Sequence, residues 1–406
     1  MHQWQKVVFA LFVGCLAAVS TALASGREFV YVESDIQSAN GNSIFAYERQ
    51  SNGSLTPVAG SPFLTGGAGT QDTSLNVGPY DSDQSIAIDQ RKRLLFAVNS
   101  GSDTIAVFHI QQDGSLKAVA GSPFPSGGTD PVSIGLAGDT AFVVNKNGDF
   151  PRPSNTLPNY TAFHVAADGS LAPVADSTVS VALGSSPSQA LVAPNANLVF
   201  GADFFGGLLQ SFRFDGQGRL HQRQATALPP SEFVNAPAAP RVALGLITHP
   251  RLPLLYAGFL TIGRVGVYRF NVLGDLSFVR SVPNSGQLVC WFRTNHSGTR
   301  MYTTNTGFFD TSSISVYDLT NPEEPQEIQI INLLGQGNAR QFAISGDEKT
   351  LYAVASRFSA QIPDGQGNAL HVFSIGTDGT LTEQAPITFA LPTGSQPQGV
   401  ASFSEN

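Results

Sequence analysis

The chain contains 406 residues with a formal net charge of -8, and its 13% of charged residues is about half the usual proportion. Its 41 Gly and 25 Pro residues, with abundant Thr, Ser, Val and Phe, favour strands and tight turns over helices. Lys and Arg are dispersed along the chain, which excludes the clustered positive charge that a nucleic-acid partner requires.

The N-terminal segment is typical of a secretory signal peptide. A positive charge precedes an apolar run over residues 7–19, which is too short to span a membrane, and Ala22-Leu23-Ala24 forms a small-x-small cleavage site. We therefore expect residues 1–24 to be removed. Residues 25–406 are expected to form a single domain that is secreted or periplasmic, without a transmembrane segment.

Processing also decides the cysteine chemistry. Cleavage before Ser25 removes Cys15 and leaves Cys290 as the single thiol, so an intrachain disulfide is impossible. The alternative is lipoprotein processing, with Cys15 as the acylated first residue. Because Cys290 has apolar neighbours, we expect a buried and unreactive thiol. An exported chain without disulfides must be stabilised by burial of apolar surface.

A sequence motif recurs about every 50 residues. The clearest copies are GSLTPVAGSPF, from Gly53, and GSLKAVAGSPF, from Gly114. Weaker copies begin at Asp168, Gly218, Gly274 and Asp378. A period of this length, built from short apolar runs and glycine turns, predicts a β-propeller rather than a helical solenoid.

Each repeat supplies an inner strand and a second strand. The predicted inner strands begin at Ser85, Val132, Gln189, Val242, Leu288, Arg340 and Gly399. The predicted second strands end at Ser34, Asn99, Asn145, Asp203, Phe259, Asn305 and Ala355. The predicted fold is therefore an all-β, seven-bladed propeller with four-stranded antiparallel blades.

Closure of the ring follows from the position of two strands. The inner strand that begins at Gly399 and the second strand that ends at Ser34 lie at opposite ends of the chain. One blade must therefore pair the C-terminal strand with the N-terminal strands, and this pairing removes open sheet edges. We expect deletion of residues 399–406 to destabilise the whole fold.

The two faces of the predicted propeller differ. The long connections all emerge where the second strands end, on a face that we name the loop-rich rim; they span about residues 65–84, 146–159, 225–241 and 357–368. The opposite face, the turn rim, carries short turns, and we expect little there to shape a pocket. Binding residues concentrate on loops held by a rigid scaffold. We therefore expect a monomer that binds a small molecule or a partner protein at the loop-rich rim.

The last residues of the second strands form a ring at the mouth of the predicted channel. Asn and Asp at these positions either bond to nearby backbone groups or jointly present polar groups to a ligand. The ligand-binding candidates are Asn99, Asn145, Asp203, Asn305 and Arg340. Arg340 begins an inner strand at this rim, and it either clamps a carboxylate or phosphate or pairs with an acid such as Asp203.

No cofactor is expected, since the sequence lacks a metal-ligand spacing, a phosphate-binding loop and a dinucleotide fingerprint. Acidic stretches at residues 81–83 and 364–368 are candidates for calcium, although Asp and Gly in loops more commonly form turns. His249 and His296 fall in turns of the turn rim, so base catalysis by histidine at the loop-rich rim is not expected.

Three segments carry a resemblance to a known family. They are FAVNSGSDTIAVFHIQQDGSL from Phe96, THPRLPLLY from Thr248 and ARQFAISGDEKTLYAVAS from Ala339. They resemble repeats of the seven-bladed lactonase family, which includes 6-phosphogluconolactonase-like proteins, carboxymuconate cyclases and YVTN-type surface propellers. The resemblance covers essentially the whole mature chain and implies a propeller in which Asp203 and Arg340 match site positions of the family.

Other site positions of that family are changed here. Ser186-Pro187-Ser188 stands where the family has two His around a Pro, Phe259-Leu260 stands where it has Asn-Glu, and Thr306 replaces an Arg. Loss of the acid and of one Arg removes groups that are worth orders of magnitude in rate. We therefore expect an exported binding propeller. A lactone hydrolase or cyclase with a different site is the alternative, and a structural role in the envelope is a third possibility.

Overall fold

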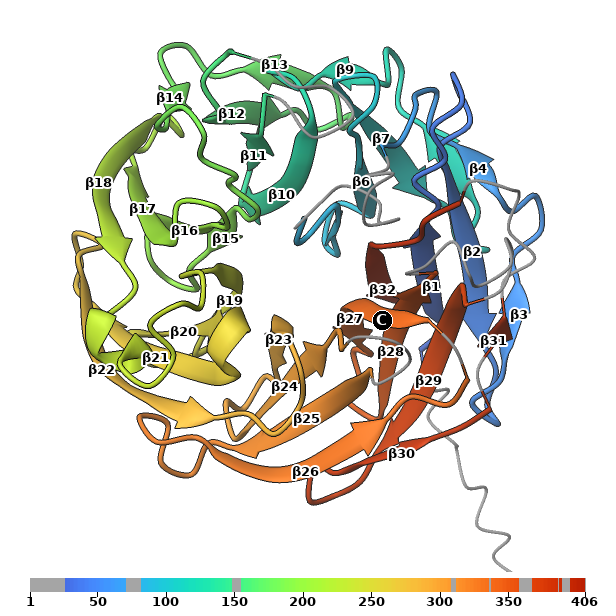
Figure 1. Cartoon of the computed structure of the whole chain (residues 1–406). Helices are drawn as coiled ribbons and strands as arrows, with labels where there is room; N and C mark the ends of the chain where they lie inside the picture. The colour runs from blue at the N-terminus through green and yellow to red at the C-terminus, as the bar shows by residue number, and fades with distance from the viewer. Residues whose placement is uncertain are drawn as a thin grey trace, which may run out of the picture.

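The computed structural model describes residues 26–70, 82–147, 155–307, 312–335, 337–357, 367–385, 387–388 and 395–405. The expected signal peptide, residues 1–24, lies outside the described residues. Seven antiparallel sheets stand around a central channel (Figure 1). The prediction of an all-β, seven-bladed propeller is confirmed.

Six of the seven blades follow one another along the chain, each listed here from the inner strand outwards. Blade 2 contains β5 (Ile86–Asp89), β6 (Leu94–Asn99), β7 (Thr104–Ile110) and β8 (Leu116–Ala118); blade 3 contains β10 (Pro131–Ala137), β11 (Thr140–Asn145), β12 (Asn159–Val165) and β13 (Leu171–Pro173). Blade 4 contains β15 (Leu191–Val192), β16 (Leu198–Asp203), β17 (Leu208–Phe214) and β18 (Leu220–Ala227); blade 5 contains β19 (Ala243–Thr248), β20 (Leu254–Phe259), β21 (Arg264–Phe270) and β22 (Leu276–Pro283). Blade 6 contains β23 (Val289–Thr294), β24 (Arg300–Asn305), β25 (Ser313–Asp318) and β26 (Gln326–Asn332); blade 7 contains β27 (Asn338–Ile344), β28 (Thr350–Ser356), β29 (Ala369–Ile375) and β30 (Leu381–Glu383).

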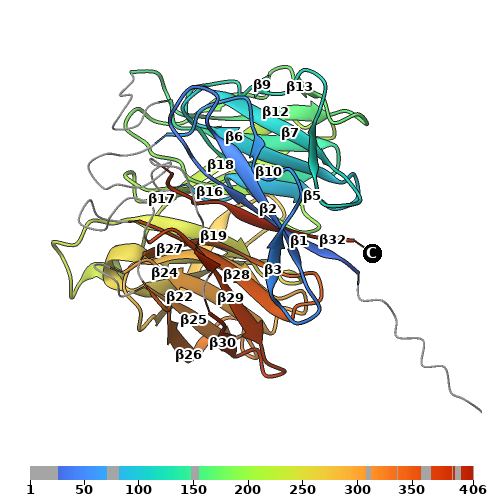
Figure 2. The ribbon, with the colours of Figure 1, turned by 90° about the vertical axis from the view of Figure 1, so that its right-hand side faces the viewer.

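Blade 1 closes the ring. Its inner strand is the C-terminal β32 (Val400–Ser404), followed outwards by β1 (Glu28–Glu33), β2 (Ser43–Arg49) and β3 (Leu55–Pro57). β32 and β1 run side by side in antiparallel register, with Phe29 opposite Phe403 and Val32 opposite Val400 (Figure 2). The predicted pairing of the two ends of the chain is confirmed.

Short additional elements lie on the outer parts of the blades. Four two-residue strands extend blades 1, 2, 3 and 7, namely β4 (Phe63–Leu64), β9 (Phe124–Pro125), β14 (Val179–Ser180) and β31 (Ile387–Thr388). Two short 3-10 helices, η1 (Pro230–Phe233) and η2 (Leu260–Ile262), lie in the connections before β19 and after β20. No helix among the described residues is long and apolar enough to cross a membrane.

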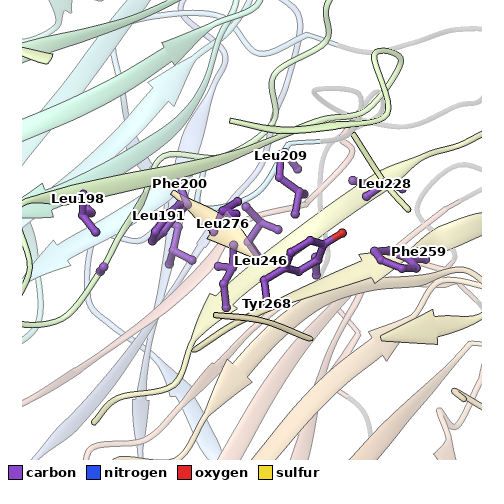
Figure 3. Packing of buried hydrophobic residues seen from close by; sticks show 14 of the residues in the cluster. Leu191, Leu198, Phe200, Leu209, Leu228, Leu246, Phe259, Tyr268 and Leu276 are labelled. Atoms are coloured by element: carbon purple, nitrogen blue, oxygen red, sulfur yellow. The ribbon is translucent and has the colours of Figure 1, made fainter. Parts of the chain in front are cut away.

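Packing between neighbouring blades forms the core. The second strands, such as LLFAVN of β6 and LLYAGF of β20, are buried along their whole length because both faces of each sheet pack against another blade. Between blades 4 and 5, Leu191 and Phe200 pack with Leu246 and Tyr268 in one cluster (Figure 3). Repeated around a closed ring, this burial stabilises the fold without a disulfide, and Cys290 is a buried free thiol as predicted.

Candidate functional site

The four predicted Asn and Asp ligand residues are fully buried at the ends of their second strands. Three of them hold the connection that enters their own blade. Asn99 accepts a hydrogen bond from Thr65 Oγ1 (2.6 Å), Asn145 donates to the carbonyl of Ser126 (3.1 Å), and Asp203 accepts from the backbone N–H of Ser186 (2.8 Å). Each of these side chains therefore bonds to the connection that enters its own blade. This is a form of the first role that the sequence left open, in which Asn and Asp bond to nearby groups of the chain.

Glycines in those connections make close packing over the Asn side chains possible. A Cβ atom on Gly67 would lie 2.4 Å from Asn99 Cγ, and one on Gly286 would lie 2.1 Å from Asn305 Nδ2. The Asn305 amide in turn donates to Ser313 Oγ and Ser315 Oγ at 3.0 and 2.9 Å. The ring of polar residues is thus built into the frame of the loop-rich rim.

Some polar atoms of the ring have no partner. Asn145 Oδ1, Asp203 Oδ2 and Asn305 Oδ1 are buried without a hydrogen-bond partner, whereas Asn99 is satisfied on both sides of its amide. Among the described residues, no hydrogen bond or ion pair joins any two of the five predicted ligand residues. Buried polar atoms without partners are uncommon in folded proteins and are characteristic of sites that bind water, an ion or a ligand.

Arg340, at the start of β27, is the fifth predicted residue. Its side chain is 6% exposed, its Nε donates to Ser356 Oγ (2.8 Å), and its Nη2 has no hydrogen-bond partner. No described carboxylate, Asp203 included, forms an ion pair with it. Burial lowers the pKa of this guanidinium to about 10. Among the described residues, no opposite charge offsets the free-energy cost of burying this cation.

Residues 82–84 cross the channel, and we name them the plug. In Figure 1 they belong to the light-blue segment near the centre of the ring. The Ser82 carbonyl accepts hydrogen bonds from three buried side chains: Trp291 Nε1 (2.8 Å), Gln398 Nε2 (3.1 Å) and Gln341 Nε2 (3.3 Å). Asp83 N–H donates across the ring to the carbonyl of Ser188 (2.9 Å). The plug therefore connects blade 2 with blades on the other side of the channel.

Sequence reasoning missed the residues that hold the plug, although a signal was present. Glutamine recurs two residues before β5, β15 and β32, at Gln84, Gln189 and Gln398, and again within β27, at Gln341. Three of these side chains, those of Gln189, Gln341 and Gln398, are fully buried or nearly so. Gln189 donates to Gln84 Oε1 (2.8 Å) and bonds to both backbone groups of Leu246. A neutral amide that repeats at one position of the inner strands indicates a hydrogen-bond network across the channel.

Buried carboxyl groups were also missed. Glu33 accepts from Asn42 Nδ2 (3.0 Å) through one oxygen only, and burial raises its pKa to about 8. Burial, reinforced by the Glu33 and Asp130 charges, raises the pKa of Asp35 well above its ordinary value. Burial raises the pKa of Asp83 to about 6, against the opposing charge of Arg293, whose Nη2 lies 3.7 Å from Asp83 Oδ1. With a pKa of about 8, Glu33 holds a proton at neutral pH, whereas Asp83, with a pKa of about 6, is mostly ionised there.

The expected calcium stretches give no metal site within the part of the chain that is described. No group of three or more His, Cys, Asp and Glu with the geometry to hold a metal ion occurs there. Asp81 and Asp364 lie outside the described residues. Cys290 packs with its Sγ 3.0 Å from Thr306 Oγ1, and burial raises the pKa of the thiol to about 11, which agrees with the predicted inert role.

The positions where the resembled family carries catalytic groups have structural roles here. Thr306 Oγ1 bonds to the carbonyl of Ala339, at 3.3 Å. Ser186 N–H caps Asp203, and Leu260 packs against the apolar cluster of blades 5–7. None of these side chains brings an acid or a cation to the channel.

The turn rim differs from the expectation. His249 and His296 lie in its turns as predicted, and His249 Nδ1 accepts the N–H groups of Arg251 and Leu252, both at 3.1 Å. The expectation that little there shapes a pocket is wrong, because a cavity of about 440 Å³ lies between the inner strands on this side. Short turns do not fill the channel, since seven inner strands diverge around it whatever the length of their turns.

Several solved propeller structures superpose on this fold. A proposed 6-phosphogluconolactonase from Bacteroides uniformis superposes with a TM-score of 0.68 at 15% identity, covering 93% of this chain and 99% of that one. A periplasmic gluconolactonase from Pseudomonas aeruginosa superposes with a TM-score of 0.64 at 15% identity, covering 93% and 100%. The fold is that of the lactonase-type seven-bladed propellers.

The resemblance seen in the sequence is thereby confirmed for the fold. A hypothetical selenium-binding protein from Sulfolobus tokodaii also superposes on this lactonase-type propeller, with a TM-score of 0.65 at 11% identity, covering 95% of this chain and 96% of that one. No family model matches the sequence, and no curated protein matches it. Proteins of different described functions thus share the scaffold, and the function must be argued from the residues of the site.

Proposed function

We propose that this lactonase-type propeller is exported and binds a small anionic molecule at the loop-rich end of its channel, through Arg340. The observation that carries the proposal is the buried guanidinium, which has a free Nη2 and no ion-pair partner among the described residues. Free oxygens of Asn145, Asp203 and Asn305 would accept hydrogen bonds from hydroxyl groups of the same ligand. Asn99 would hold the loop at the rim in place and would not contact the ligand, because both the oxygen and the nitrogen of its amide already have hydrogen-bond partners.

Replacing Arg340 by Met tests this role. We expect Arg340→Met to weaken binding of 6-phosphogluconate, measured by titration calorimetry, by about 1.5–3 kcal/mol, which is the contribution of a hydrogen bond to a charged group. The same variant should unfold at an equal or higher temperature, because removing an unpaired buried charge relieves a desolvation cost of about 1–4 kcal/mol.

Arg213→Met is the matched control, since that arginine is exposed on β17. It should change neither binding nor stability. A stability loss for Arg340→Met together with unchanged binding would show that Arg340 is a structural residue, and the proposed anion site would be rejected. Separate titrations with gluconate and with inorganic phosphate show whether the sugar acid or the phosphate group accounts for the affinity.

A lactone hydrolase is the second candidate. It is favoured by the likeness to a periplasmic gluconolactonase and by the buried carboxyl groups of Glu33 and Asp83, because burial raises their pKa values to about 8 and about 6. We nevertheless expect 6-phosphogluconolactone and glucono-lactone to hydrolyse at their spontaneous rates, because Leu260 and Thr306 replace the Glu and Arg of the family pattern. Turnover of about 1–1000 per second in a pH-stat assay would instead establish the hydrolase.

Export is the remaining part of the proposal. It is supported by the apolar run and the small-x-small site that precede Ser25. Intact mass and N-terminal sequencing of the secreted or periplasmic protein should give a chain that begins at Ser25. A diacylated species beginning at Cys15 would instead show that the protein is a lipoprotein anchored to the membrane.

A further inference from the structure

A chamber lies in the channel on the turn-rim side of the plug. The cavity of about 440 Å³ is lined by residues of all seven inner strands, and Gln84 of the plug contributes to its wall. A neighbouring groove of about 480 Å³ shares Gln90, His296, Ile344 and Ser402 with the chamber, so the chamber is approached from the turn rim. Its size is within the usual range of about 300–1,000 Å³ for small-molecule sites.

Aliphatic side chains and polar groups share the lining of the chamber, which carries one fixed positive charge. Ile88, Ile134 and Leu191 are typical of the walls, and no lining residue is Asp or Glu, although the chain carries a net charge of -8. Arg293 supplies the positive charge. His296 is held at the opening by Glu348, 3.1 Å from its Nδ1, and Glu348 itself does not line the chamber.

The Arg293 guanidinium is only partly satisfied by the protein. Nη1 donates to the carbonyl of its own neighbour Phe292 (2.7 Å), and Nη2 lies 3.7 Å from Asp83 Oδ1, which is too long for a hydrogen bond. The group lies over the ring of Phe342, with its central carbon 5.9 Å from the ring centre. Donors of Arg293 thus remain available at the chamber, which Gln84 and Gln90 also line.

We propose that this chamber binds a small organic carboxylate with a compact apolar body, its carboxylate on Arg293 and its body against the aliphatic walls. Guanidinium pairs with carboxylate in bidentate geometry, and the described ion-pair partner of Arg293, Asp83, lies 3.7 Å away and does not line the chamber. The site is separate from the one proposed at Arg340, because the plug and its hydrogen bonds lie between the chamber and the loop-rich end of the channel.

Benzoate is the probe, and neutral benzamide is its matched control. Titration of benzoate into the protein with labelled isoleucine δ1 methyl groups should shift Ile88, Ile134 and Ile344, which line the chamber, and benzamide should bind at least tenfold more weakly. Arg293→Gln should weaken benzoate binding at least tenfold. Ala401→Phe should abolish it by filling the chamber, without removing the Arg293 and Asp83 charges. Arg213→Gln should have no effect.

Several results would overturn the proposal. Equal affinity for benzoate and benzamide, or methyl shifts confined to isoleucines outside the chamber, would show that no carboxylate site exists there, even if Arg293→Gln failed to fold. Loss of benzoate binding in Arg340→Met, with Ala401→Phe unaffected, would place the anion at the loop-rich end. That outcome would leave the proposed function intact while rejecting the chamber, so the two proposals fail separately.

Discussion

A chain that ends at Gln398 is expected to lose most of its stability. The deletion removes β32, which pairs with β1 at five positions, from Glu28 opposite Ser404 to Val32 opposite Val400. It also removes Phe403, which is 2% exposed in the core of blades 1 and 2. Loss of one such aromatic side chain costs about 3–5 kcal/mol, and the exposed edge of β1 adds to this. The sum approaches the total of about 5–15 kcal/mol that stabilises a typical domain.

Thermal and urea unfolding, followed by circular dichroism, measure this effect. The matched control is Glu405→Ala, which removes only the partly exposed ion pair with Arg93 (2.9 Å) and should cost less than about 1 kcal/mol. If the truncated chain unfolds at the same temperature as the full chain, the C-terminal strand does not close the ring. Recovery of structure on adding a peptide of residues 399–406 would support closure directly.

Stability is expected to fall as the pH rises from 6.5 to 8. Burial raises the pKa of Glu33 to about 8, so the folded chain holds a proton that the unfolded chain releases near its ordinary pKa of about 4.3. The folded state therefore binds more protons throughout this interval, and its stability decreases with pH by about 2 kcal/mol over the interval. Asp35, whose pKa burial raises as well, acts in the same direction.

The variant Glu33→Gln separates the contribution of Glu33 to this pH dependence from the contributions of other titratable groups. A Gln side chain keeps an oxygen acceptor for Asn42 Nδ2 and cannot ionise, so the pH dependence between 6.5 and 8 should become markedly flatter. Urea unfolding at each pH gives the free energies. Burial lowers the pKa of His249, so that residue acts in the opposite direction, at lower pH, and lies outside the interval. Stability that rises from pH 6.5 to 8 would show that Glu33 is ionised in the folded protein.

The fold could be predicted from the sequence because its signals are local and repeated. Short apolar runs separated by turns placed the inner and second strands, and the run ending at Ser34 lacked an inner partner until the one from Gly399 was assigned to it. Ring closure then followed from strand pairing alone. The predicted ends of the second strands also agree with the structure, since Asn99, Asn145, Asp203 and Asn305 each end one.

The environment of the site could not be predicted to the same extent. Whether Asn99 faces a ligand or a connecting loop depends on how residues 65–70 pass over it, and those contacts are tertiary. The plug is a second example, because nothing in the local sequence places Ser82 opposite Trp291, which is more than 200 residues away. The raised pKa of Glu33 likewise follows from burial between blades rather than from its neighbours in the chain.

The plug connects several blades to one another from inside the channel. Hydrogen bonds join Ser82 and Asp83 to residues on, or just before, four other inner strands, namely Ser188, Trp291, Gln341 and Gln398. These contacts form only when widely separated parts of the chain have come together, so we expect these hydrogen bonds to form late in folding. Residues 82–84 also lie between the chamber and the loop-rich end of the channel. A solute that enters from the turn rim therefore meets residues 82–84 before it can reach Arg340.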